Sequence, residues 1–151
     1  MAADPLDQPY RGGFVGPEHH FALTVYFEDT DAYRVVYYAN YLRFMERARS
    51  DMIRAVGVDQ NRELERSGSA YVVVEVDIRY VSPARLGDEL VVVSTIDQVR
   101  AASVAIQQRV MRNGELLTDA RVTAAFLDAS GRPQRQPKDW VDRFRSITTS
   151  Q

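Results

Sequence analysis

The stretch FEDTDAYRVVYYANYLRFMERAR, residues 27 to 49, starts with a cluster of carboxylates and then changes to helical spacing. From its second half onward, apolar residues recur at intervals of three or four, at Tyr41, Met45, Ala48, Met52 and Val56. This is the spacing of one face of an amphipathic α-helix. Asn40 is a suitable N-cap and Gly57 a suitable stop. We therefore predict one long helix directly after the carboxylates.

Alternating apolar and polar residues predict strands on both sides of this helix. One strand is expected over residues 21–27, and four more over 71–80, 90–97, 104–111 and 115–128. Asn113 and Gly114 are the strongest short hairpin signal in the chain. A short C-terminal helix is expected around Trp140, Val141 and Phe144. The order of these segments predicts an α+β fold, with a five-stranded antiparallel sheet and one long helix.

One helix can cover only part of a sheet face. The remaining apolar surface and the edge strands therefore need another partner. A second copy of the same chain is the simplest partner, so the sequence predicts at least a homodimer.

Length and composition limit the function classes. The 151 residues suit a single domain, which we place at 19–148, after a flexible leader at 1–18 that is rich in Pro, Gly and polar residues. A formal net charge of -2 gives no bias toward nucleic acid. No apolar run could span a membrane and no secretory signal is evident, so we expect a cytoplasmic protein. Without cysteine, only His19 and His20 could supply nitrogen ligands, so no metal or cofactor is expected.

The carboxylates before the helix have two readings. A helix N-terminus offers unpaired N–H groups and partial positive charge, which favour an oxyanion, and Asp31 could supply the base or nucleophile for ester or thioester hydrolysis. In the other reading, Asp29, Thr30 and Asp31 only cap local N–H groups in a polar loop. Spacing alone favours the second reading.

Three segments bear on this choice: YFEDTDAYRVVYYANYLRFMERAR, SPARLGDEL and RNGELLTDARV. They resemble the hotdog-fold acyl-CoA thioesterases of the 4-hydroxybenzoyl-CoA thioesterase group, especially the YbgC type found with Tol-Pal operons. The resemblance covers residues 21 to about 137. It implies a sheet wrapped around one long helix, dimers paired edge to edge, frequent homotetramers, and active sites between subunits. It also implies hydrolysis of short-chain or aromatic acyl-CoA, with acyl carrier protein thioesters as further candidate substrates.

The same resemblance implies roles for particular residues. Asp31 becomes the catalytic nucleophile or base, and the backbone N–H of Tyr38 the oxyanion donor. The expected substrate-binding residues are Tyr37, Asn40, Tyr41, Tyr71, Val72, Val73 and Arg100, of which Arg100 matches a turn that meets the coenzyme A phosphates.

The sequence departs from the family pattern at two positions. Arg34 stands where the family usually has glycine, so a positive φ there would be strained. Tyr38 stands where YbgC-type enzymes commonly carry histidine, which leaves Asp31 to act alone or with the Tyr38 hydroxyl. Two alternatives therefore stay open: a hotdog protein that binds acyl thioesters or acyl carrier protein without turnover, and a tailoring thioesterase of polyketide assembly.

A further carboxylate, Glu46, lies on the predicted helix, where another hotdog clan places its nucleophile. Arg49 follows three residues later, and such a spacing favours a surface ion pair over a catalytic role.

Overall fold

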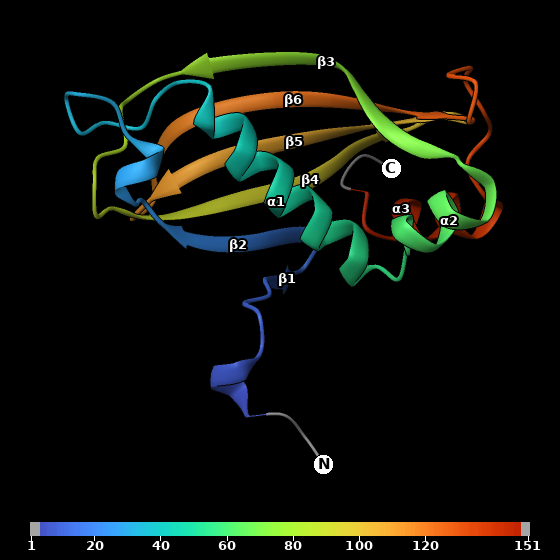
Figure 1. Cartoon of the computed structure of the whole chain (residues 1–151), viewed down its shortest axis with the longest axis horizontal. Helices are drawn as coiled ribbons and strands as arrows, with labels where there is room; N and C mark the ends of the chain where they lie inside the picture. Colours follow the sequence, from blue (N-terminus) through green and yellow to red (C-terminus); the bar gives the residue numbers. More distant parts are fainter. Residues whose placement is uncertain (1–3, 149–151) are drawn as a thin grey trace.

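The computed structural model describes residues 4–148. Its elements are η1 (Pro5–Asp7), β1 (Gly13–Val15), β2 (Glu18–Thr24), η2 (Phe27–Asp29), α1 (Asn40–Ala55), α2 (Gln60–Ser67), β3 (Ala70–Tyr80), β4 (Glu89–Val99), β5 (Ser103–Arg112), β6 (Glu115–Leu127) and α3 (Lys138–Ser146). The strands form one antiparallel sheet in the order β1-β2-β4-β5-β6-β3. α1 lies across one face of this sheet (Figure 1). The α+β arrangement is the predicted one.

The predicted number of strands is wrong, because the sheet has six strands. The additional strand, β1, pairs with β2 from Gly13 opposite His20 to Val15 opposite Glu18. Sheet pairing thus starts at Gly13, inside the segment that the sequence predicts as a leader. Three residues are too few to show an alternating pattern, and the surrounding glycines and prolines are typical of a loop. The first predicted strand also lies earlier, because β2 ends at Thr24 and Phe27 belongs to η2.

The apolar face of α1 is the predicted one. Tyr41, Met45, Ala48 and Met52 are all buried. The first three pack in one core cluster with Leu90, Val92, Val110, Leu117 and Val122 of the sheet. Met52 packs in a second cluster with Ile96, Ile106, Phe126, Trp140 and Phe144. Burial of each large side chain contributes about 2 kcal/mol, so these contacts fix α1 against the sheet.

The other helices agree with the prediction to different degrees. α3 confirms the C-terminal helix, with Trp140 and Phe144 buried. α2 was predicted as a polar connection; none of its eight residues is buried, so it lacks the apolar stripe that identifies a helix in a sequence. α1 begins at Asn40 and its N-cap is Ala39, so the predicted N-cap is wrong by one residue. No helix within residues 4–148 is both long enough and apolar enough to cross a membrane.

The hairpin between β5 and β6 confirms the Asn-Gly signal. Asn113 and Gly114 have φ angles of 49° and 81°, and Arg112 pairs with Glu115. Two positive φ angles in a two-residue loop are the geometry of a type I′ turn, which matches the twist of the strands it joins.

β3 is an edge strand, and this changes the predicted burial of its side chains. The alternation in residues 71–80 is typical of a strand with one buried face, but Val72, Val74 and Val76 are exposed. A bulge between Val73 and Glu75 shifts the register against β6. An edge with exposed valines and unpaired backbone groups is suited to pairing with another strand.

Candidate active site

The loop before α1 holds Asp31 in a tight turn. The Asp31 amide donates to the Val35 carbonyl and the Arg34 amide donates to the Asp31 carbonyl, both at 3.0 Å. One carboxylate oxygen of Asp31, Oδ1, accepts the Tyr33 amide at 2.9 Å. The side chain is half-buried. The local capping role considered for this residue is therefore real, but it uses one of the two carboxylate oxygens.

Arg34 has a φ of 60°, in the left-handed region that favours glycine. A nearby segment of the same chain holds Arg34 in this conformation. The Leu86 amide donates to the Arg34 carbonyl at 2.9 Å, and Val35 forms a bridge with Arg85. The loop thus keeps a conformation suited to glycine, and the arginine adopts it at a cost of about 1 kcal/mol.

The loop is tied to the start of α1 through one carbonyl group. The Asp29 oxygen accepts the Tyr37 amide at 3.0 Å and the Asn40 side-chain amide at 2.8 Å. Thr30 and Val36 form an antiparallel bridge beside it. Asn40 therefore anchors the acidic loop instead of capping the helix.

The Tyr38 amide is oriented by its neighbour. The Tyr37 carbonyl accepts the Asn40 amide at 2.8 Å and so points into the first turn of the helix. In a trans peptide the N–H lies opposite the carbonyl, so the Tyr38 N–H points away from the helix. Among the hydrogen bonds of residues 4–148, none uses this N–H as donor. A substrate oxygen could accept it.

A cavity of about 250 Å³ lies beside this turn, and its lining residues are Val36, Tyr38, Tyr41, Tyr80, Val81, Ser82 and Pro83. Tyr38 and Tyr41 were predicted as site residues, whereas Tyr80 was not. The Tyr80 hydroxyl donates to the Tyr38 carbonyl at 3.0 Å. Asp31 is not among the residues that line this cavity.

Two tyrosines near this turn, Tyr37 and Tyr80, have raised pKa values. The neighbouring Tyr38 hydroxyl raises the pKa of Tyr37, and burial, followed by Tyr38 and Tyr41, raises the pKa of Tyr80. Neither of these two hydroxyls can act as a base near pH 7, whereas an aspartate carboxylate can. No group of three or more His, Asp or Glu side chains within residues 4–148 is arranged to hold a metal ion.

The other predicted binding residues lie at the opposite end of β3 from Tyr80. Tyr71 begins this end, and its ring contacts the rings of Phe126, Trp140 and Phe144. Its hydroxyl donates to Gln136, and burial raises its pKa. Val72 and Val73 follow it and are exposed. None of these three residues lines the cavity beside Tyr38.

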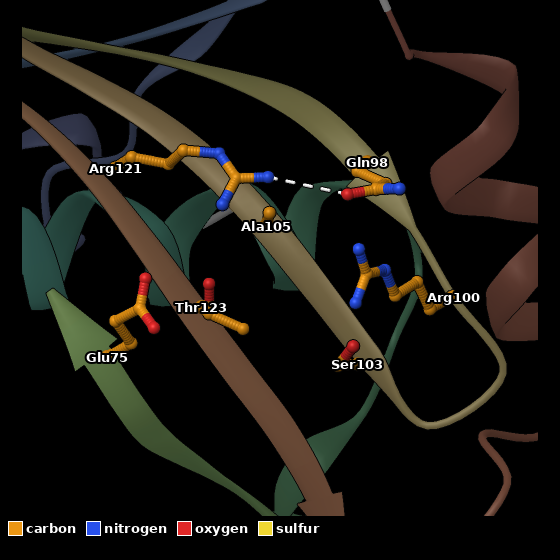
Figure 2. Close-up of a pocket in the computed structure, with 7 residues that line it drawn as sticks. All are labelled: Glu75, Gln98, Arg100, Ser103, Ala105, Arg121 and Thr123. Atoms are coloured by element: carbon orange, nitrogen blue, oxygen red, sulfur yellow. Dashed lines mark hydrogen bonds between the residues drawn. The ribbon is translucent and has the colours of Figure 1, made fainter. Parts of the chain in front are cut away.

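Arg100 lines a second cavity, of about 260 Å³ (Figure 2). The other lining residues are Glu75, Gln98, Ser103, Ala105, Arg121 and Thr123. Ser103 and Ala105 alternate with the core residues Val104 and Ile106, so this cavity lies on the sheet face away from α1. The guanidinium group of Arg100 approaches it from the turn after β4 and that of Arg121 from β6, and Glu75 lies across from them (Figure 2).

Sequence reasoning missed Arg121. It is one of several charged residues on alternating strand positions, and nothing local distinguishes it. Its Nε donates to Asp97 Oδ2 at 2.8 Å and its Nη2 to Gln98 at 3.4 Å, which holds the side chain beside the cavity.

The predicted surface pair of Glu46 and Arg49 is wrong. Glu46 accepts the Ser50 hydroxyl at 2.9 Å. Arg49 is partly buried and donates to Gln108 at 3.0 Å, on β5. Arg49 thus belongs to a polar network between α1 and the sheet.

Comparisons with known proteins identify the family of the chain. The sequence pattern of the thioesterase-like superfamily matches residues 25–146. The acyl-CoA thioesterase YbgC of Haemophilus influenzae is 40% identical over 128 residues, which are 84% of this chain and 94% of that protein. The acyl-CoA thioester hydrolase YbgC of Escherichia coli is 37% identical over 125 residues, 82% of this chain and 92% of that protein.

Solved structures show the same fold. A probable thioesterase from Bartonella henselae is 31% identical, with a TM-score of 0.74 over 80% of this chain and 98% of that one. A 4-hydroxybenzoyl-CoA thioesterase in complex with 4-hydroxybenzoyl-CoA has a TM-score of 0.78 over 84% of this chain and 98% of that one, at 20% identity. At this identity the likeness concerns the hotdog fold alone.

Proposed function

Because the chain belongs to the thioesterase-like hotdog superfamily and is an acyl-CoA thioesterase, we propose that Asp31 and the Tyr38 backbone N–H together hydrolyse the thioester of a short-chain or aromatic acyl-CoA. The observation that carries this proposal is the Tyr38 N–H, which points away from the helix, has no acceptor within residues 4–148 and belongs to a residue that lines a cavity.

In the proposed reaction, the thioester oxygen accepts the Tyr38 N–H, and the partial positive charge at the start of α1 stabilises the oxyanion that forms there. Asp31 acts in one of two ways. As a base, its carboxylate takes a proton from the water that attacks the carbonyl carbon. As a nucleophile, it attacks this carbon itself and forms an anhydride that water then hydrolyses. In both cases the carbon–sulfur bond breaks, and the products are a carboxylate and free coenzyme A.

A panel of acyl-CoA and acyl carrier protein thioesters tests the activity, with free-thiol release as the readout. We expect the Asp31→Asn variant to lose turnover by about a thousandfold or more with an unchanged melting temperature, because its volume and its bond from Tyr33 are kept. Glu28→Gln is the control, since Glu28 is an exposed carboxylate in the same loop. Turnover by Asp31→Asn at the wild-type rate would remove Asp31 from the mechanism.

The complete site, in this proposal, forms between two chains. Val72 and Val73 lie at one end of β3 and Tyr80 at the other, and Tyr80 contacts the Tyr38 turn. Two β3 edges related by a two-fold axis pair antiparallel, which sets the Val72 end of one against the Tyr80 end of the other. The exposure of Val72, Val74 and Val76 supports such an interface. Arg100 would then come from the second copy, with its guanidinium available to the coenzyme A phosphates.

The assembly has its own test. Val74→Lys places a charge at the middle of the exposed edge, and we expect it to give monomers with little turnover. Val15→Lys, on the short strand at the other edge of the sheet, is the matched control. Sedimentation velocity measures the oligomer, and a dimer that survives Val74→Lys unchanged would contradict this interface. Dimers of such dimers and a cytoplasmic location remain predictions from the sequence.

A further inference from the structure

The Tyr38 turn is held from a distant part of the chain by Tyr80, the last residue of β3, which pairs with Thr118 of β6. Its hydroxyl donates to the Tyr38 carbonyl at 3.0 Å, across 42 residues of sequence. The Tyr80 ring meets the Tyr38 ring edge-on, with centroids 6.1 Å apart, and the Tyr41 ring at 5.6 Å. Tyr80 thus fixes the carbonyl and packs against the side chain of the same residue.

The start of α1 depends on such external ties. Its N-cap, Ala39, provides no side-chain hydrogen bond. The Tyr37 end of the turn is held by the Asp29 carbonyl, which accepts the Tyr37 and Asn40 donors. The Tyr38 end is held by Tyr80. The peptide group before the Tyr38 α-carbon is held by the Asn40 amide, which donates to the Tyr37 carbonyl at 2.8 Å, and the peptide group after it is held by Tyr80.

Peptide planarity connects these ties to the oxyanion donor. The Tyr38 N–H shares one rigid plane with the Tyr37 carbonyl, and the Tyr38 carbonyl belongs to the next plane. Only the two backbone torsions of Tyr38 join these planes, so a hydrogen bond to each plane restricts both torsions. Loss of the Tyr80 bond would let the second plane rotate, and the first plane would then lose part of its support.

We propose that Tyr80 is a positioning residue for hydrolysis, whose hydroxyl holds the Tyr38 carbonyl and thereby the direction of the Tyr38 N–H toward the developing oxyanion. This inference rests on the proposed role of the Tyr38 N–H. It adds a residue of the edge strand that neither the sequence pattern nor the proposed reaction requires.

Such a role affects the transition state more than the bound substrate. The negative charge on the thioester oxygen develops only during the reaction, so a misdirected N–H lowers kcat and leaves ground-state binding nearly unchanged. Complete removal of an oxyanion donor costs about a hundredfold or more in kcat, and a donor that is present but less well held should cost less, on the order of tenfold.

The test compares Tyr80→Phe with Tyr10→Phe. Each change removes one hydroxyl that bonds to the backbone, but the Tyr10 hydroxyl accepts the Ala22 amide, on β2. For Tyr80→Phe we expect kcat to fall about tenfold, with KM and the Kd of a non-hydrolysable thioether analogue of acyl-CoA within about twofold of wild type. Tyr10→Phe should match the wild type in all three constants.

Several outcomes would overturn the inference. The first is an unchanged kcat in Tyr80→Phe, and the second is an equal loss of kcat in Tyr10→Phe. The third is a weakening of thioether binding that accounts for the whole loss of activity in Tyr80→Phe. The fourth is a Tyr80→Phe protein that is unfolded at the assay temperature. Asp31→Asn, measured in parallel, separates this inference from the proposed function. If Asp31→Asn is inactive and Tyr80→Phe is normal, only the role of Tyr80 fails. If Asp31→Asn retains turnover, the proposed function fails.

Discussion

The Asp51→Ala variant tests how the N-terminal hairpin is held to the domain. Asp51 lies on α1, and its Oδ2 accepts the Gly12 amide at 2.9 Å and the ring nitrogen Nε2 of His19 at 2.8 Å. His19 is completely buried. A carboxylate only accepts, so Nε2 carries the hydrogen. Burial acts to raise the pKa of Asp51, but hydrogen bonds from Arg54, Gly12 and His19 outweigh it and hold this pKa below the usual value.

The size of the effect follows from these contacts. Truncation to alanine leaves the Gly12 and His19 donors without their acceptor, at a cost of about 1–3 kcal/mol each. Loss of the Arg54 bond adds less than about 1 kcal/mol, because the Arg54 side chain is about half exposed. We expect the free energy of unfolding to fall by about 3 kcal/mol in total. For a chain of this length, that corresponds to a melting temperature lower by about 6–12 °C.

Urea and thermal unfolding measure this change, with Glu115→Ala as the control. Glu115 also pairs with an arginine, at 2.5 Å from Arg112, but its side chain is largely exposed. The control should lose less than about 1 kcal/mol. Hydrogen exchange in Asp51→Ala should quicken first at the Gly12 amide. Equal and small losses in the two variants would refute the reasoning that buried donors dominate.

Three further changes have expected outcomes. Arg34→Gly should raise the free energy of unfolding by about 0.5 kcal/mol in urea titrations, because it relieves the left-handed strain, and Arg34→Ala should not. Acidification from pH 7 to 5 should destabilise the fold, because burial lowers the pKa of His19. Below about pH 6.5 the unfolded chain binds a proton at His19 that the folded chain does not bind. The free energy of unfolding should then fall by at most about 1.4 kcal/mol per pH unit. His19→Gln should flatten this slope, and an unchanged slope would assign it to other groups. Met52→Ala should lose about 3 kcal/mol by calorimetry, because Met52 is fully buried, whereas Leu64→Ala on the exposed face of α2 should lose little; similar losses would contradict the assigned core.

The sequence predicted the elements whose evidence is local. The burial of Tyr41 and Met45 follows from helical spacing, and the hairpin at Asn113 and Gly114 follows from turn chemistry. The acidic loop before α1 was recognised from its motif, and the strain expected for a positive φ at Arg34 applies, because Arg34 has a φ of 60°. Each of these depends on residues within one or two turns of the chain.

The rest of the site was decided by the tertiary structure. Several features involve residues far apart in sequence. They are the sixth strand, the exposed edge of β3, the position of Arg121 beside Arg100, and that of Tyr80 beside Tyr38. Alternation within a strand predicts two faces but not which strand lies at the edge, because strand order depends on how the whole sheet pairs. The sequence by itself determined the long helix, five of the six strands and the acidic loop. Only the packed sheet determined what surrounds that loop, since a contact across 42 residues leaves no periodic trace along the chain.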